Sequence, residues 1–229
     1  ACAATAAELN AKGPGSCVAV QADLSTEAGC KALAAEIAKH ETRVDVLINN
    51  SGVAWGGDFQ NHGEKSWARV LDLNVKAPFF LTVALLPLLD AAATSSDAAR
   101  VINIGSTAGL RPQPISTFAY DTSKAAIHHL TRVLAAKLAR RPNGGHILVN
   151  AIAPGLVPSK MSKGITFALQ ASFSELSKAI PLARVGETQD FAGLAIFLAS
   201  KASGWISGEV IASDGGHTYA TEASMGPKL

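Results

Sequence analysis

The alternation of short β-branched runs with longer amphipathic stretches constrains the fold of this chain more than any other feature of its sequence. The runs have the length and composition of buried strands, and crossovers of tens of residues separate them. Connections of that length join parallel strands, with helices over both faces of the sheet. The pattern predicts a doubly wound α/β domain with strands at residues 17–21, 44–49, 101–104, 146–152 and 210–212.

Two of the intervening stretches repeat apolar residues at the spacing of one buried helical face. The positions are Cys30, Leu33, Ala34 and Ile37 in the first stretch and Ile127, Leu130, Leu134 and Leu138 in the second. No internal repeat and no linker rich in Pro, Gly or Ser divides the chain, so we expect residues 1–229 to form a single domain. Residues 154–187 are rich in Lys and Ser with poor periodicity, which is typical of a functional lid.

Composition excludes several classes of function. Of the 229 residues 48% are apolar and the formal net charge is +2, so we expect neither disorder nor binding to nucleic acid or a membrane. The longest apolar stretch, residues 77–89, is too short to cross a bilayer. Three cysteines without a CxxC pair indicate a reducing, cytoplasmic location. Six histidines without a pair at ligand spacing beside a carboxylate predict no metal site.

A hydroxyl, a phenol and an ammonium group follow the strand expected at 101–104, at the edge where open α/β sheets bind ligands. Tyr120 and Lys124 are four residues apart and share one helix face. Such pairs also occur by chance on many helices, so the context decides. We expect Lys124 to lower the pKa of Tyr120 toward the range of general acid–base catalysis. Ser106 lies at the strand end, where it can hydrogen-bond a substrate carbonyl oxygen.

Seven short segments in order along the chain supply that context: ADLS, LINNSG, LDLNV, VINIGS, YDTSK, NAIAPG and SDGG. On these segments the chain resembles the short-chain dehydrogenase/reductase family along nearly its whole length, which implies a Rossmann-type sheet. The runs VINIGSTAGL, FAYDTSKAA and IAPGLVPSKM are most similar to one branch of that family. It is the branch of 3-oxoacyl-[acyl-carrier-protein] reductases associated with rhamnolipid biosynthesis.

The resemblance implies a role for individual residues. Tyr120 would protonate the substrate oxygen, Ser106 would orient the carbonyl, and Lys124 would hold the nicotinamide ribose. Asn74 would anchor a water that replenishes the proton, and Asp23 would approach the adenine. The positions expected to line the cofactor are Asp23, Asn49, Gly52, Tyr120, Lys124, Pro154, Gly155, Val157 and Ser159, and those expected to border the substrate are Trp55 and Met161.

The same resemblance implies an oxidoreductase that reduces a carbonyl, foremost a 3-oxoacyl thioester, with NADP(H), while NAD(H) stays open. Apolar residues between 157 and 169 are consistent with an acyl chain. Residues 100–141 carry seven basic side chains and one acid. These charges either form a solvent-exposed helix face or bind an acyl carrier protein or a coenzyme A phosphate. The family pairs subunits through helices that correspond to residues 64–89 and 118–139, which implies a homodimer or homotetramer.

Two departures from the family pattern leave alternatives open. Ser106 precedes Tyr120 by one position more than is usual, so either the loop at 111–116 has an extra residue or Thr107 takes the hydroxyl role; we favour Ser106. The family's glycine-rich TGxxxGxG turn and its first two strands are not found here, since Gly13 and Gly15 enclose a proline and no third glycine follows. The first residue is Ala, and we expect a domain that is incomplete at its amino end.

Either these residues belong to a longer enzyme, or the chain has rearranged or pairs with a second copy and has lost dinucleotide binding. The second hypothesis makes it a truncated, non-catalytic module for binding or oligomerisation. Saturable NADPH binding separates the two. A sugar-nucleotide epimerase shares the Tyr and Lys pair, but it needs a larger carboxyl-terminal domain than the few residues after Gly216.

Overall fold

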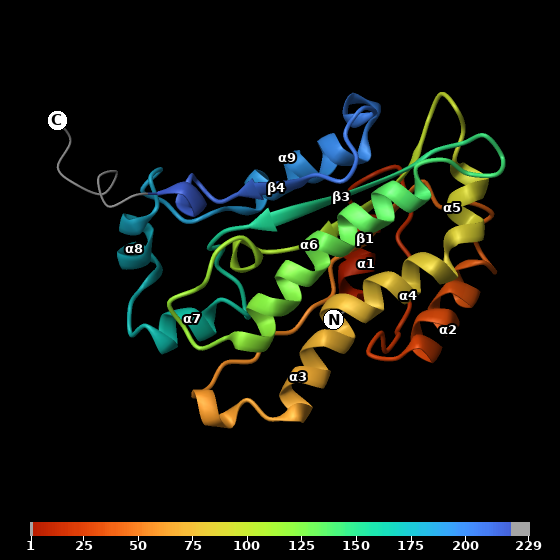
Figure 1. The fold of residues 1–229 in the computed structure, drawn as a ribbon. Coiled ribbons are helices and arrows are strands. Elements are labelled where there is room, and N and C mark those ends of the chain that lie inside the picture. The colour runs from red at the N-terminus through yellow and green to blue at the C-terminus, as the bar shows by residue number, and fades with distance from the viewer. Residues whose placement is uncertain (1, 221–229) are drawn as a thin grey trace.

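A parallel sheet forms the centre of the molecule (Figure 1). The computed structural model describes residues 2–220. Within them the strands are β1 (Val46–Asn49), β2 (Ala99–Ile104), β3 (Ile147–Pro154) and β4 (Val210–Ser213), in this order across the sheet. All neighbours are parallel, so the four carboxyl ends meet at one edge. The predicted parallel α/β fold and four of its five predicted strands are confirmed.

Helices and short turns connect the strands. The α-helices are α1 (Cys2–Asn10), α2 (Glu27–Ile37), α3 (Glu64–Leu71), α4 (Ala77–Ala84), α5 (Leu86–Ala92), α6 (Phe118–Leu138), α7 (Lys163–Ala168), α8 (Phe173–Leu176) and α9 (Thr188–Ala199). The short turns are η1 (Phe59–Asn61), η3 (Thr107–Gly109), η4 (Ser177–Ala179), η5 (Lys201–Ser203) and η6 (His217–Tyr219), while η2 (Asp72–Lys76) is π-helical. The predicted helical stripes fall within α2 and α6. In residues 2–220 no single helix is long and apolar enough to cross a membrane, and the bent pair 64–84 and 86–92 reaches that length and composition only together.

Both faces of the sheet are covered, because successive side chains of a strand point to opposite sides. On β2, Val101 packs toward α4, α5 and α6, while Ile102 packs toward α9. Figure 1 shows α4 and α6 along one face and α9 along the other. Helices on both faces are what a buried parallel sheet requires.

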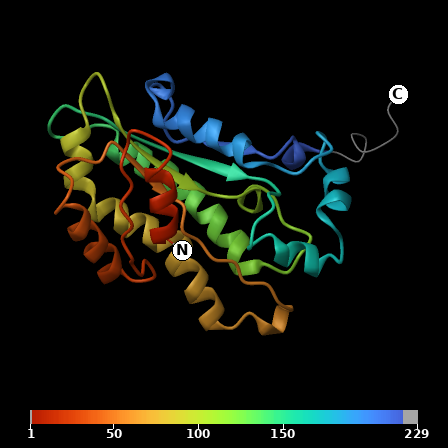
Figure 2. The same cartoon turned by 180° about the vertical axis from the view of Figure 1, so that it is seen from behind.

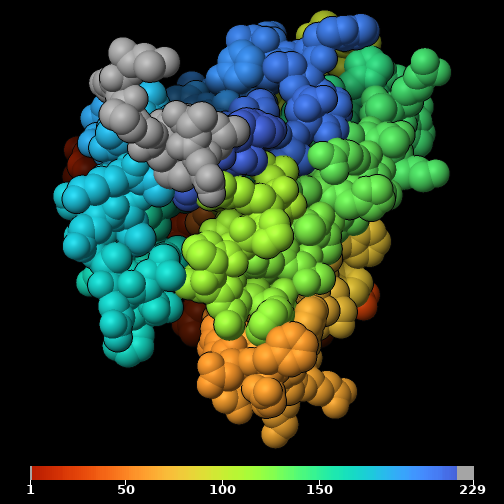
Figure 3. All heavy atoms as spheres, turned by 60° about the vertical axis from the view of Figure 1, so that its left-hand side comes forward, coloured from red at the N-terminus to blue at the C-terminus, as the bar shows by residue number. Residues whose placement is uncertain are grey.

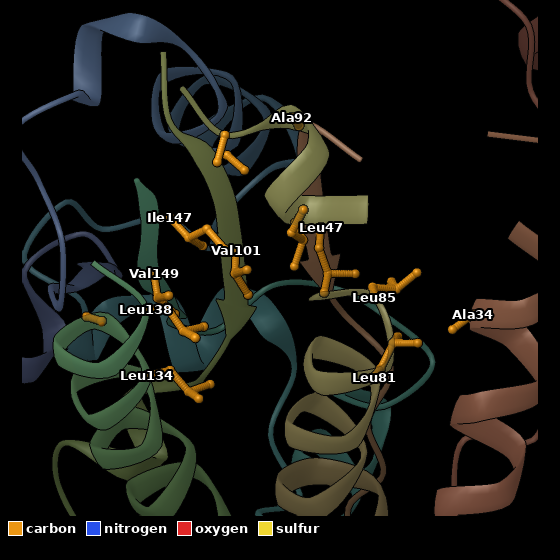
Figure 4. Packing of buried hydrophobic residues seen from close by; sticks show 14 of the residues in the cluster. Ala34, Leu47, Leu81, Leu85, Ala92, Val101, Leu134, Leu138, Ile147 and Val149 are labelled. Carbon is orange, nitrogen blue, oxygen red and sulfur yellow. The ribbon is translucent and has the colours of Figure 1, made fainter. Parts of the chain in front are cut away.

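Leucine side chains fill the space between the sheet and its covering helices (Figure 4). In Figure 4, Leu81 and Leu85 lie near Leu47 of β1, while Leu134 and Leu138 of α6 lie near Val149 of β3. Leu89 of α5 belongs to the same buried cluster. The cluster also contains Val101 and Val149, which are fully buried. Burial of one such leucine side chain contributes about 1.5 to 3 kcal/mol, so this layer holds α6 against the sheet.

The strand predicted at residues 17–21 is wrong. These residues run as a connection between α1 and α2 without regular structure (Figure 2), and the Val18 side chain is 72% exposed. A strand needs a neighbour to accept its backbone hydrogen bonds. In the part of the chain that the structure describes, the sheet ends at β1, and α2 packs against α4 instead.

We expect Leu89→Ala to lower the free energy of unfolding by about 2 to 5 kcal/mol, because it removes buried methyl groups and leaves a cavity beside β2. Urea denaturation monitored by circular dichroism measures this. Leu9→Ala is the matched control, since Leu9 lies half exposed on α1 and its loss should change stability by no more than about 0.5 kcal/mol. Equal effects of both substitutions would contradict the packing described.

Candidate active site

The start of α6 brings Tyr120 and Lys124 to the carboxyl end of β2. The two residues lie one helical turn apart, so their side chains share a face. The Lys124 ammonium is buried and donates a hydrogen bond of 2.8 Å to the carbonyl oxygen of Ile104, the last residue of β2. It lies 5.6 Å from the centre of the Tyr120 ring. Tyr120 and Lys124 therefore lie together at the carboxyl end of β2, as the sequence predicts.

Ser106 follows β2 and its side chain reaches Tyr120. The backbone of Ser106 is extended, and its Oγ accepts a hydrogen bond of 3.1 Å from the N–H of Ala108, which caps η3. The Ser106 side chain lies near enough to the Tyr120 phenol to lower the pKa of that phenol. Thr107, the alternative hydroxyl, is buried within η3. The geometry favours Ser106 as the hydroxyl that acts with Tyr120.

A π-helical turn, η2, directs the Asn74 side chain toward α6. Oδ1 of Asn74 accepts a hydrogen bond from the backbone N–H of Val53, and Nδ2 donates to the Val53 carbonyl and to the Ser123 hydroxyl, each at 2.9 Å. Ser123 Oγ in turn donates to the Tyr120 carbonyl at 2.7 Å. One extra residue in a helical turn re-aims a side chain in this way. Asn74 thus ties the loop after β1 to the start of α6.

Burial shifts the pKa values of Tyr120 and Lys124. It raises the pKa of Tyr120 above its usual value; the hydrogen bond with Ser106 partly offsets this, and the charge of Asp121 adds to it. Burial also lowers the pKa of Lys124 to about 8. The expected lowering of the Tyr120 pKa by Lys124 is therefore wrong for this structure, because desolvation of the phenol outweighs any effect of the ammonium charge.

The loop after β1 packs closely against Asn74 and Lys124 at Gly52. A Cβ atom at Gly52 would lie 3.2 Å from Oδ1 of Asn74 and 3.8 Å from Nζ of Lys124. Asn49, the last residue of β1, turns its side chain into the sheet, where Nδ2 donates to Oδ1 of Asn103 at 2.9 Å. Gly52 therefore borders the site, whereas the Asn49 amide is used by β2.

The end of β3 lies against the segment that follows β4. The Gly155 N–H donates to the Ser213 carbonyl at 2.9 Å, and a Cβ atom at Gly155 would lie 2.6 Å from Cβ of Asp214. A residue without a side chain is required for that approach. Pro154 ends β3 immediately before it. The carboxyl end of β3 is therefore fixed beside the end of β4 by backbone contacts at Gly155.

Val157 and Ser159 begin the excursion that leads to α7. Ser162 Oγ donates to the Val157 carbonyl at 2.6 Å and accepts from the Ser159 N–H at 2.7 Å. The hydroxyls of Ser159 and Ser162 are 3.0 Å apart and hydrogen-bonded. The Ser159 hydroxyl is thus bound locally rather than to another predicted site residue.

Asp23 keeps its interactions local, because its carboxylate accepts the Ser25 N–H at 2.9 Å and that hydrogen bonding lowers its pKa. Trp55 is 39% exposed and Met161 is 45% exposed. Figure 3 shows the surface hollowed between the start of α6 and the segment with α7 and α8. Among residues 2–220 no group of three or more His, Cys, Asp or Glu side chains is placed to hold a metal ion.

Three buried polar residues of this region escape the sequence patterns. Ser123 links Asn74 to Tyr120, and Asn103 links Asn49 to Thr131 on α6 by a 2.9 Å bond. His128 lies one turn after Lys124 on the same face. The signal for Ser123 and His128 is a polar residue at a helix position that faces the core, and for Asn103 it is a polar residue within a buried strand.

Comparison with known proteins places this geometry in a family. The family model described as enoyl-(acyl carrier protein) reductase matches residues 1–218. The chain is 44% identical over 216 residues to the rhamnolipids biosynthesis 3-oxoacyl-[acyl-carrier-protein] reductase of Pseudomonas aeruginosa, which spans 94% of this chain and 82% of that protein. It is 32% identical over 237 residues to the short-chain dehydrogenase/reductase PhomF of Diaporthe leptostromiformis, spanning 92% of this chain and 77% of that protein.

A solved structure agrees with the sequence relatives. The Pseudomonas aeruginosa RhlG/NADP active-site complex matches with a TM-score of 0.86 and 43% identity, over 95% of this chain and 82% of that chain. The resemblance carried by the seven short segments is thereby confirmed. The family model and the relatives above 30% identity show that this chain belongs to the short-chain dehydrogenase/reductase family of oxidoreductases.

Proposed function

We propose that this chain is an NADP(H)-dependent reductase that converts a carbonyl, foremost that of a 3-oxoacyl thioester, to the alcohol. The observation that carries the proposal is the grouping of Ser106, Tyr120 and Lys124 at the carboxyl end of β2. Two similar proteins support it. One is named a 3-oxoacyl-[acyl-carrier-protein] reductase, and the other is an active-site complex with NADP.

The surroundings of Lys124 fit the nicotinamide ribose of NADP(H). The ammonium has three N–H donors and gives one to Ile104, which leaves two for ribose hydroxyls. Gly52 lies beside the ammonium, since a Cβ atom there would be 3.8 Å from Nζ. When bound, the cofactor supplies the hydride. The sequence contains no TGxxxGxG turn, so we assign these residues to the ribose and nicotinamide end, with Pro154, Gly155, Val157 and Ser159 beside it and Asn49 and Asp23 toward the adenosine.

Tyr120 acts as the general acid. Its raised pKa keeps the phenol protonated at neutral pH, and reduction of a carbonyl requires a protonated donor. The Ser106 hydroxyl donates a hydrogen bond to the carbonyl oxygen and stabilises the charge that develops there. Lys124 holds the ribose, and a water anchored at Asn74 returns the proton. Each of these steps is a proton transfer or a hydrogen bond from this chain's own residues.

Exposed apolar side chains after β1 and β3 agree with an acyl substrate. Trp55 and Met161 are 39% and 45% exposed, and Phe167 on α7 is 87% exposed. An acyl carrier protein or coenzyme A would present the thioester to these side chains. The exposed phenyl ring is the feature that favours an acyl substrate over a small polar ketone.

We further propose a single domain that forms a homodimer or homotetramer in a reducing compartment. Cys2, Cys17 and Cys30 are free thiols, which a reducing compartment maintains. The outer faces of α4 and α6 expose Phe79 and Val133, apolar side chains that a second copy would cover. Sedimentation equilibrium measures the oligomeric state directly.

Tyr120→Phe should lower kcat/KM for a 3-oxoacyl thioester with NADPH by about 10² to 10⁴-fold, because the general acid is removed while the ring and its packing stay. The oxidation of NADPH, followed by absorbance, measures the rate. Tyr219→Phe is the matched control: Tyr219 is the second tyrosine of the chain and 81% exposed, and its loss should leave the rate unchanged.

Titration with NADPH tests the alternative of a non-catalytic module. Saturable binding by the folded chain, competed by NADP+, supports the reductase. A folded protein that binds neither form of the cofactor would contradict it and would favour the module. Binding without turnover of any 3-oxoacyl thioester would reject the substrate and keep the cofactor.

Lys124→Met should stabilise the fold at pH 7 by about 2 kcal/mol while it abolishes activity. Burial lowers the pKa of Lys124 from 10.5 to about 8, a shift that opposes folding by about 3 kcal/mol below pH 8, and loss of the bond to Ile104 returns about 1 kcal/mol. Between pH 8 and 10.5 the unfolded chain binds more protons than the folded chain, so wild-type stability rises with pH and the gain from Lys124→Met disappears. Urea unfolding at pH 7 and at pH 10 measures both effects.

The control for this prediction is Lys137→Met, which removes an exposed lysine from the last turn of the same helix. Its effect should stay within about 0.5 kcal/mol at both pH values. A destabilised Lys124→Met protein at pH 7 would show that the buried ammonium contributes to stability, contrary to the argument.

A further inference from the structure

A buried histidine extends the row of polar side chains on α6. Tyr120, Lys124 and His128 follow one another at intervals of four residues, so all three lie on the face toward the carboxyl end of β2. The His128 side chain is 2% exposed. The reductase chemistry described above uses the first two members of the row and leaves the third without a role.

The N–H of Ser106 donates a hydrogen bond of 3.4 Å to Nε2 of His128. That N–H follows the end of the sheet ladder. Ile104 is the last residue of β2 in register with β3, and the N–H of Gly105 makes a further bond of 2.7 Å to the Ile152 carbonyl. The part-buried N–H of Ser106 lies beyond the ladder, so its partner comes from α6 instead of from a strand.

Gly105 permits this contact. A Cβ atom at position 105 would lie 2.1 Å from Nε2 and 2.7 Å from Cδ2 of His128, and 3.2 Å from the Ile152 carbonyl oxygen. No heavy atoms pack that closely without displacement, so any other residue would push the ring away from the strand end. Gly105 and His128 are therefore in close contact, and this contact positions Ser106, the next residue in the chain.

The ring must be neutral to accept this hydrogen bond, and its surroundings keep it neutral. Burial and the charges of Lys124 and Arg132 lower the pKa of His128 to about 4, against a smaller opposing effect of the Gly109 backbone on η3. A neutral imidazole whose Nε2 accepts must carry its proton on Nδ1. Nδ1 is buried and has no hydrogen-bond partner within the described residues. The geometry thus selects one of two tautomers.

We propose that His128 is a positioning residue whose Nε2, in the Nδ1–H tautomer, accepts the Ser106 N–H and so fixes the Ser106 hydroxyl beside Tyr120. The proposal rests on the proposed function for the role of that hydroxyl. Without the contact the backbone of Ser106 could rotate, and its Oγ would lose the direction that Tyr120 and a substrate carbonyl require. His128 touches neither substrate nor cofactor and acts through the strand end.

Nitrogen-15 NMR of the histidine-labelled protein tests the tautomer without any substrate. We expect the His128 resonances, assigned by their absence in His128→Gln, to show a protonated Nδ1 and an unprotonated Nε2 that do not titrate between pH 6 and pH 8. In water a free imidazole prefers the opposite tautomer, so this result is specific to the contact. A protonated Nε2, or a ring that titrates near pH 6.5, would overturn the proposal.

Kinetics of three variants test the positioning role. His128→Leu keeps much of the volume but removes the acceptor, and should lower kcat on the order of tenfold with the KM for NADPH unchanged. His128→Gln places an amide oxygen near the position of Nε2 and should restore most of the rate. His129→Leu changes the exposed neighbour on the same helix and should have no effect. Equal losses in the Leu and Gln variants would overturn the proposal.

A double variant separates positioning from general damage. In a Ser106→Ala background the hydroxyl is gone, so adding His128→Leu should change the residual kcat less than twofold. A further tenfold loss in that background would show that His128 acts on the fold rather than through Ser106, and would overturn the proposal. If Ser106→Ala itself retains full activity, the proposed function fails, whereas the tautomer measurement stands independently of it.

Discussion

A buried ammonium group at the carboxyl end of β2 is the constraint on which the rest of the site depends. Lys124 is held by its bond to the Ile104 carbonyl and by the packing of α6 on β3. A charge taken out of water is unfavourable unless polar groups surround it. The core below it, with Leu134 and Leu138 against Val149, provides the rigidity that keeps that charge in place. Stability is thus given up at this point, where the ammonium lies 5.6 Å from the centre of the Tyr120 ring.

The helix α6 fixes the spacing of Tyr120, Lys124 and His128, whereas the loop before it can vary in length. Its first turn is anchored by Asp121, whose carboxylate accepts hydrogen bonds from the Thr117 hydroxyl at 2.8 Å and from the Gln113 N–H at 3.2 Å. That anchor lies in the loop with one residue more than is usual between Ser106 and Tyr120. An extra residue in this loop remains a prediction, and it agrees with the position of Ser106, whose side chain lowers the pKa of Tyr120. A surface loop tolerates insertion where a helix face does not.

The periodicity of apolar residues predicted the helices and strands whose pattern is local. It did not predict strand pairing or hydrogen-bond partners, which depend on residues far away in the sequence. The apolar spacing of α2 and α6 and the runs of four strands follow from the burial of one face or two, which the sequence shows directly. Residues 17–21 have the composition of a strand, but pairing requires a neighbour that the local sequence does not reveal. The Asn49 amide bonds Asn103 across 54 positions, and no short motif indicates that partner. The direction of the Tyr120 pKa depends on burial, which appears only once the chain is folded.

Burial raises the pKa of Tyr120 and lowers the pKa of Lys124. Both shifts favour reduction of a carbonyl over oxidation of an alcohol. Burial disfavours the charged form of each, so the phenol keeps its proton while the ammonium releases one near pH 8. A protonated phenol is ready to donate, which reduction of a carbonyl needs; oxidation of an alcohol needs the phenolate. As pH rises, the ammonium loses its charge before the phenol does. The same low polarity that lowers the Lys124 pKa keeps His128 neutral, and one buried face of α6 therefore sets all three proton positions.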